Sequence, residues 1–333
     1  MNKIYPWQTE VWKRIQQESN RLPHALLLYG QAGVGKYDFA LNLSQALLCS
    51  NPTPQGFACE SCSSCNWFKE GNHPDFNLLS PEQESESDED TTPVKKTKKK
   101  TQISVSQIRE LAGFTGLSSH RNDGLRIILV HPAEALNIAS ANALLKMLEE
   151  PAPGVVFILI SHQIQRLLPT ILSRCHKIAM PVPNEADALN WLDEQGVSNS
   201  KEQLDYLEGS PIKVMEQQNE FSQLKDVWRL LAQGEKLQPH IAAPALIANS
   251  TELGIIAIQK WLYDLAAMCL SHQVRYHTAL AKTFQGLADK VHLNRLFDLQ
   301  KKADELRKLA NHPLNHDLQM ESLLLDYTRI FKH

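Results

Sequence analysis

Seven residues near the N-terminus have the types and the spacing of a phosphate-binding loop. They run from Gly30 to Lys36, read GQAGVGK and fit the pattern GxxxxGK. In that pattern backbone N–H groups and a helix N-terminus surround phosphate oxygens, and the lysine ammonium pairs with them. The candidate nucleotide-binding residues are therefore Gly30, Gly33, Gly35 and Lys36. The pattern continues with Ser or Thr, whose hydroxyl binds Mg²⁺, but this chain has Tyr37 at that position.

The chain also lacks the acids that ATP hydrolysis requires. A hydrolytic site of this kind needs an acid at the end of a neighbouring strand to hold the metal ion, usually followed by a glutamate that activates water. Here the predicted strand that ends at Val130 is followed by His131 and Pro132, and the next acid is Glu134. We therefore expect no ATP hydrolysis by this chain alone. Binding of ATP without hydrolysis stays open, because the glycines and the lysine of the loop are present.

Four of the six cysteines lie within 17 residues, at Cys49, Cys59, Cys62 and Cys65. In a reducing compartment such a cluster binds metal more often than it forms disulfides. The spacing Cx9CxxCxxC supplies four thiolates for a tetrahedral zinc ion and leaves no open position for a catalytic water. The sequence therefore predicts structural zinc. Four buried thiols without a metal, or a redox CxxC pair, are the alternatives, although the prolines and the glycine after Cys49 suit a core poorly.

The composition indicates a soluble globular protein of two or three domains. Of its 333 residues 43% are hydrophobic and 21% are charged, and apolar runs such as Val155–Ile160 are far shorter than the roughly 18 residues of a membrane span. The first ten residues, MNKIYPWQTE, have no signal-peptide or transit-peptide pattern, which predicts a cytoplasmic location. A net charge of −3 argues against DNA binding by this chain alone through bulk positive charge.

A low-complexity segment at residues 82–100 interrupts the chain. It begins with EQESESDED and ends with KKTKKK, and it has almost no apolar residue. Such a segment cannot repay the entropy of ordering, so we predict a disordered surface insertion. A basic arm for DNA is the alternative, but the acidic run would compete for the same lysines.

Strands and helices alternate through the first half of the chain. The hydrophobic pattern predicts strands at 25–29, 125–130 and 155–160 and helices at 37–48, 106–117 and 139–150. The strands are continuous apolar runs, which is typical of a parallel sheet covered on both faces. Beyond about Pro183 the strand signal disappears and helical stripes predict two all-helical pieces. Two of these stripes are Ile255, Ile258, Leu262, Leu265 and Cys269, and Leu296, Leu299, Ala303 and Leu306.

Four segments together resemble the clamp-loader branch of the AAA+ ATPases. They are HALLLYGQAGVGK at 24–36, the four-cysteine cluster, ANALLKMLEEP at 141–151 and ILSRC at 171–175. Recognisable motifs cover about residues 1–215. The incomplete ATP site is similar to the subunits of this branch that do not hydrolyse ATP, and differs from the gamma/tau motor subunits.

The resemblance implies three domains and a role in trans for one arginine. The domains are a RecA-like α/β AAA+ domain at 1–181 with a zinc module at 49–75, a helical lid at 182–219 and a helical collar at 220–333. In this family the arginine of the SRC motif, here Arg174, is an arginine finger that reaches ATP bound by the neighbouring motor subunit. A structural ion pair is the alternative for this residue.

The resemblance further implies a stator that supports ATP-dependent loading of the sliding clamp onto primed DNA, within a replicative DNA polymerase holoenzyme. Its partners would be the gamma/tau and delta subunits in a ring of five, with the clamp and DNA reached through the complex. The alternatives are an AAA+ ATPase with its own turnover and a zinc-module DNA-binding protein.

Overall fold

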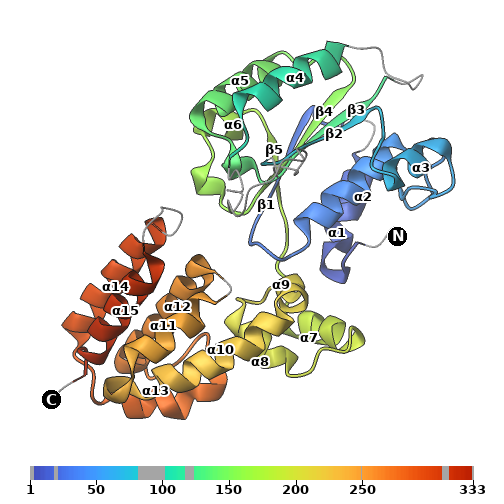
Figure 1. Ribbon diagram of the computed structural model, residues 1–333. Coiled ribbons are helices and arrows are strands. Elements are labelled where there is room, and N and C mark those ends of the chain that lie inside the picture. The colour runs from blue at the N-terminus through green and yellow to red at the C-terminus, as the bar shows by residue number, and fades with distance from the viewer. Residues whose placement is uncertain are drawn as a thin grey trace, which may run out of the picture. The chain divides into compact units, whose positions relative to one another are not determined.

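The structure is a computed structural model that describes residues 4–18, 22–81, 102–116, 124–248, 250–309 and 315–331. The predicted insertion at 82–100 lies outside the described residues. The chain divides into two compact units, Met1–Pro183 and Asn184–His333 (Figure 1). Division of the second unit into a lid and a collar stays a prediction.

The first unit contains a five-stranded sheet in which every neighbouring pair is parallel, which confirms the predicted parallel α/β fold. The strand order is β2-β3-β4-β1-β5. The strands are β1 (Ala25–Tyr29), β2 (Phe76–Leu79), β3 (Arg126–Val130), β4 (Val155–Ser161) and β5 (His176–Ala179). The three predicted strands are the three central ones, and the two strands without a predicted counterpart form the edges of the sheet.

Helices cover both faces of this sheet (Figure 1). Alternate strand residues supply the two apolar cores, since Leu26 and Leu28 face one layer and Ala25 and Leu27 face the other. This double burial explains why the central strands are continuous apolar runs. The first layer contains α1 (Thr9–Gln17) and α2 (Lys36–Leu48), and the second contains α4 (Val105–Gly116), α5 (Ile138–Glu149) and α6 (Pro169–Leu172). The three predicted helices agree with α2, α4 and α5 to within one residue at each end.

The second unit is helical throughout its described residues, around one continuous apolar core. The first four residues of the predicted stripe that begins at Ile255 are almost completely buried in this core, as are three of the stripe that begins at Leu296. The helices are α7 (Glu185–Glu194), α8 (Ser200–Tyr206), α9 (Pro211–Glu216), α10 (Gln218–Leu231), α11 (Pro239–Ile247), α12 (Thr251–Ser271), α13 (Ala281–Ala288), α14 (Leu293–Lys308) and α15 (His316–Thr328).

Helix α12 has the length and the hydropathy of a membrane-spanning helix, which the short apolar runs did not predict. Of its most apolar window 56% is buried inside the protein, and its buried side chains belong to the core of the second unit. Burial in this core accounts for the hydropathy of the helix.

Gly254 marks a close contact between α11 and α12. A Cβ atom at this position would lie 2.3 Å from the carbonyl oxygen of Leu246. We therefore expect Gly254→Ala to lower the free energy of unfolding by about 1–3 kcal/mol, because the two helices must move apart. Gly286→Ala in α13 is the matched control, since nothing lies within 4 Å of its added Cβ. It should leave stability unchanged or raise it by up to about 1 kcal/mol. Urea unfolding followed by circular dichroism measures both, and equal losses would contradict the assigned contact.

Candidate nucleotide and metal sites

The predicted phosphate loop connects β1 to α2, with Gly30, Gly33 and Gly35 in the loop and Lys36 as the first residue of the helix. Gly35 caps the helix with a φ of 81°, in the left-handed region that favours glycine. A Cβ here would also lie 2.3 Å from the ring of Tyr5. The loop thus has the strand–loop–helix context that the sequence predicts. Position 35 requires glycine both for its backbone conformation and for the close approach of Tyr5.

Lys36 is folded back into this loop. Its side chain is buried, with the residue only 2% exposed. The ammonium Nζ donates hydrogen bonds to the carbonyl oxygens of Gly30 at 2.7 Å and Gln31 at 2.5 Å. The loop therefore holds a buried positive charge beside the N-terminus of α2, which is the arrangement that binds phosphate.

The outer side of the loop is held by an N-terminal segment that the sequence analysis did not single out. Trp7 Nε1 and Gln8 Nε2 both donate to the carbonyl oxygen of Val34, at 3.0 and 2.8 Å. The Tyr5 hydroxyl donates to Asp38 of α2 at 2.7 Å. No local sequence pattern predicts these contacts, because the partners lie more than 25 residues apart along the chain.

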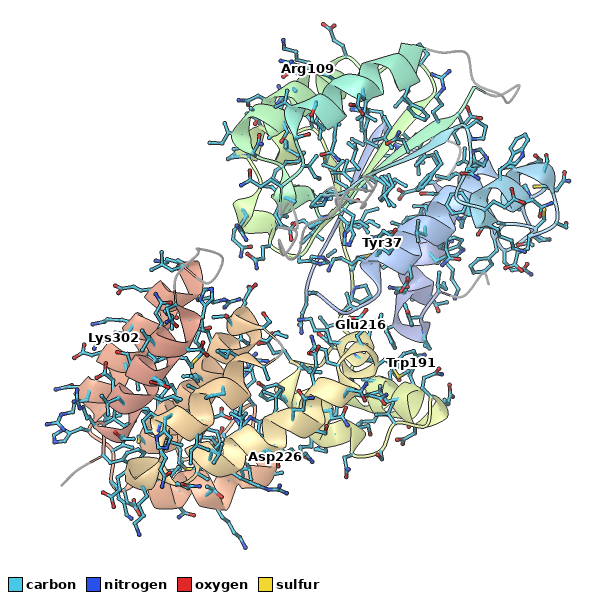
Figure 2. All side chains as sticks on the ribbon, viewed as in Figure 1. Tyr37, Arg109, Trp191, Glu216, Asp226 and Lys302 are labelled. Carbon is cyan, nitrogen blue, oxygen red and sulfur yellow. The ribbon has the colours of Figure 1, made fainter. Side chains whose placement is uncertain are left out.

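Tyr37 occupies the position from which a hydroxyl would reach Mg²⁺, at the start of α2 (Figure 2). Its ring stacks on that of His131 with centroids 4.7 Å apart, and burial, followed by the charge of Asp38, raises the pKa of the phenol. Glu134, the next acid after β3, accepts a hydrogen bond from the backbone N–H of His162 at 2.9 Å. Tyr37 therefore offers no hydroxymethyl group for a Mg²⁺ ion, and one oxygen of Glu134 is already used by the backbone.

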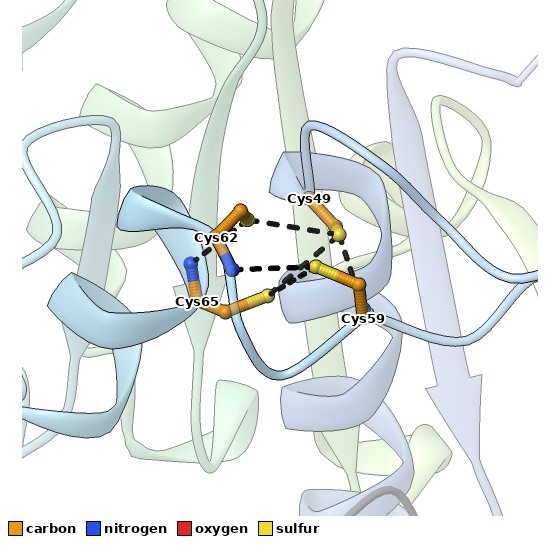
Figure 3. Close-up of side chains that lie close together, drawn as sticks. All are labelled: Cys49, Cys59, Cys62 and Cys65. Carbon is orange, nitrogen blue, oxygen red and sulfur yellow. Dashed lines mark hydrogen bonds between the residues drawn. The ribbon is translucent and has the colours of Figure 1, made fainter.

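The four predicted cysteine ligands come together at one point (Figure 3). Cys49 directly follows α2, and the other three lie in the loop before and at the start of α3 (Ser63–Lys69). All four Sγ atoms lie within 4.8 Å of one another. Three of the Sγ–Sγ distances are 3.6, 3.9 and 3.9 Å. Four thiolates at about 2.3 Å from a tetrahedral ion would be separated by about 3.8 Å. The cluster can therefore hold a metal ion.

Backbone N–H groups point at the sulfurs of this cluster. Cys59 N donates to Cys49 Sγ at 3.2 Å, and Cys62 N donates to Cys59 Sγ at 3.4 Å. Hydrogen bonds from the backbone and hydroxyl of Ser61 and from the backbone of Cys62 lower the pKa of the Cys59 thiol to about 5. Burial raises the pKa of the Cys65 thiol instead. A bound metal ion would deprotonate this thiol as well.

His73 ties the cluster to the sheet without being a ligand. The Ser64 hydroxyl donates to the carbonyl oxygen of Leu48, and it shares a 2.8 Å hydrogen bond with His73 Nε2. His73 Nδ1 accepts from the backbone N–H of Asp75 at 3.0 Å, just before β2. The residues 49–75 therefore form a compact insertion between α2 and β2, held at both ends.

Arg174 lies after α6 and before β5. Its Nη2 lies 2.5 Å from Glu149 Oε1, and its Nη1 donates to the carbonyl oxygen of Thr170 at 2.9 Å. The side chain remains 33% exposed. The register pairs the first residue of β5 with Leu26, so Arg174 precedes the strands. The phosphate loop follows β1 at the opposite end of the same parallel sheet.

A parallel sheet with a lysine-containing phosphate loop after β1 defines a P-loop protein. Comparison with known proteins gives the family: residues 7–184 match the family described as DNA polymerase III, delta subunit. The DNA polymerase III subunit delta' of Pseudomonas aeruginosa is 33% identical over 99% of this chain and 99% of its own. The subunit delta' of Haemophilus influenzae is 32% identical over 65% of this chain and 62% of its own. That of Bacillus subtilis is 35% identical over 60% of this chain and 54% of its own. The chain belongs to the delta prime family of DNA polymerase III subunits.

The low pKa of the Cys59 thiol predicts its reactivity in metal-free protein. Prepared with a chelator and reductant, the protein should be alkylated by iodoacetamide at Cys59 already at about pH 6, because its thiolate forms there. The rate should change little between about pH 6 and pH 8. The control is Cys175, whose pKa burial raises to about 11. It should stay unlabelled in the folded protein. Mass spectrometry of peptides gives both rates, and a rate at Cys59 that climbs tenfold per pH unit would contradict the assignment.

Proposed function

We propose that the chain is the stator of the clamp loader of DNA polymerase III, a subunit that supports ATP-dependent loading of the sliding clamp onto primed DNA without hydrolysing ATP itself. Membership of the delta prime family supports this role. Its partners are other clamp-loader subunits, and we propose gamma/tau and delta subunits in a ring of five. The work would take place in the cytoplasm.

One observation carries the proposal, namely the placement of Arg174 relative to the phosphate loop of its own chain. The arginine lies before the strands and the loop lies after them, so the sheet separates the two. Tyr37 and His131 meanwhile fill the place where the chain would need metal-binding groups. If the arginine acts on a nucleotide, that nucleotide is therefore on another subunit, where its rigid fork of donors suits developing phosphate charge.

The ion pair with Glu149 is compatible with this role. Both side chains are partly exposed, and pairs of this kind contribute about 0–1 kcal/mol. The pair therefore orients the guanidinium in the free subunit and can open at little cost when a phosphate is presented.

The domain organisation belongs to the same proposal. The RecA-like AAA+ domain would span 1–181, the lid 182–219 and the collar 220–333. The second unit has one continuous helical core, from Ala188 to Phe331, so the proposed boundary between lid and collar rests on the family resemblance and not on separate cores.

We also propose that the ion in the four-cysteine cluster is zinc with a structural role. Four thiolates close a tetrahedral shell, so no position remains for a catalytic water. The fit of the sulfur separations to zinc–thiolate bonds supports this ion.

Substitution of Arg174 tests whether this residue acts in ATP hydrolysis or in assembly of the complex. Arg174→Ala should leave the fold and assembly with gamma/tau and delta subunits unchanged, because only a partly exposed ion pair and one hydrogen bond to the Thr170 carbonyl are lost. Clamp loading should fall at least tenfold, while total ATP hydrolysis falls less because other sites in the ring still act. Arg174→Lys should restore little, since an ammonium lacks the planar fork. Gel filtration, ATP hydrolysis and clamp loading on primed DNA are compared in the reconstituted complex.

Two control variants distinguish the finger from the ion pair. Arg166→Ala removes an exposed arginine from the same connection between β4 and β5 and should load clamps normally. Glu149→Gln breaks the ion pair but keeps Arg174, so it should also load clamps. If Glu149→Gln is as defective as Arg174→Ala, the arginine has a structural role and the proposed finger is wrong.

The zinc assignment predicts one zinc ion per chain in natively purified protein. Cys62→Ser should release the ion and destabilise mainly residues 49–75, because three thiolates no longer close the shell. Cys269→Ser, outside the cluster, should keep the full zinc content. Elemental analysis and hydrogen exchange measure the two effects, and native protein without zinc would reject the assignment.

A further inference from the structure

Two histidines stand beside the phosphate loop where a hydrolytic site would have acids. The neighbouring strands β1, β4 and β3 are parallel and end at the same edge of the sheet. The residues that follow them, Gly30, His162 and His131, therefore emerge side by side. The two imidazole rings lie with centroids 5.5 Å apart.

His131 is partly buried and has an unused polar atom. Its Nδ1 has no hydrogen-bond partner among the described residues, and neither has Glu134 Oε2. Buried polar atoms of this kind usually have a partner, which points to a ligand or water at this place. Around the ring lie Tyr37, Lys36, His162 and Glu134, and the backbone N–H of His131 donates to the end of β2.

These surroundings disfavour the charged form of His131 in the free protein. Burial lowers its pKa below the ordinary value, the charge of Glu134 acts in the opposite direction, and the charge of Lys36 lowers the pKa further. A phosphate group beside Lys36 would reverse this balance, because it adds negative charge next to the ring.

We propose that the phosphate loop binds a di- or triphosphate group without a divalent metal ion, and that His131 takes up one proton from solvent as the phosphates bind. The imidazolium then supplies part of the positive charge that Mg²⁺ supplies in a hydrolytic site. This inference goes beyond the clamp-loader role and does not depend on it.

The direction of the pH dependence follows from the proton taken up. Bound phosphate raises the pKa of His131 above its value in the free protein, so binding is tightest below the free value and weakens as pH rises through the bound one. For one proton the affinity changes by at most about tenfold per pH unit.

Isothermal titration calorimetry on the full chain in EDTA tests this proposal. The probes are ADP and inorganic pyrophosphate, at several pH values between about 6 and 8, in two buffers of different ionisation enthalpy. We expect binding without Mg²⁺, net uptake of up to one proton and a severalfold loss of affinity across this range. Lys36→Met should abolish binding, because it removes the charge within the loop.

The His131→Gln protein should bind both probes with an affinity that depends less on pH. The remaining pH dependence should come from titration of the ligand itself. His240→Gln, an exposed histidine on α11, is the matched control and should behave like the unsubstituted protein. If His131→Gln does not fold, the proton uptake of the unsubstituted chain beyond the ligand's own titration decides, and no such excess would overturn the proposal.

If both probes bind, the phosphates alone are enough for binding. If ADP binds and pyrophosphate does not, the nucleoside contributes as well. Absence of binding by either probe, a requirement for Mg²⁺, or equal proton uptake by the unsubstituted protein and His131→Gln would overturn the proposal. None of these failures affects the clamp-loader role, which the Arg174 variants test in the assembled complex.

Discussion

The position of β1 between β4 and β5 is the constraint on which the rest of the first unit depends. Because all three strands are parallel, the residues that directly follow them lie at one end of the sheet and the residues that directly precede them lie at the other. The phosphate loop and the two histidines share the first end, and Arg174 occupies the second. One pairing pattern therefore places the loop and the arginine of a single chain at opposite ends of the sheet.

The residues that replace the metal-binding groups contact one another. The ring of Tyr37 stacks on His131, and the carboxylate of Glu134 holds the backbone after β4. The site has thus exchanged groups that bind a divalent ion for an aromatic and imidazole contact, while the buried ammonium of Lys36 remains in the loop. The groups that hydrolysis requires and the lysine that would pair with phosphate therefore lie on different residues of this site.

The sequence predicts the strands that are buried on both faces and the sites whose residues are close together in the chain. The central strands β1, β3 and β4 are recognisable because both faces are covered, and the cysteine ligands because they are close in the chain. The edge strand β5, with sequence HKIA, exposes three of its four residues and has no apolar run. The contacts of Trp7 and Gln8 with Val34 also have no signal, because they join segments that only the folded chain brings together.

The four-cysteine cluster and the sheet differ in how much of the chain each requires. The four cysteines span residues 49–65, so their thiols can come together once that short segment has left the ribosome. Strand β1 has no partner until β4 and β5 have been made, more than 120 residues later. Closing so long a loop costs more entropy and takes more time than closing a short one. During translation the four-cysteine segment can therefore become ordered before the strand that precedes it has neighbours to pair with.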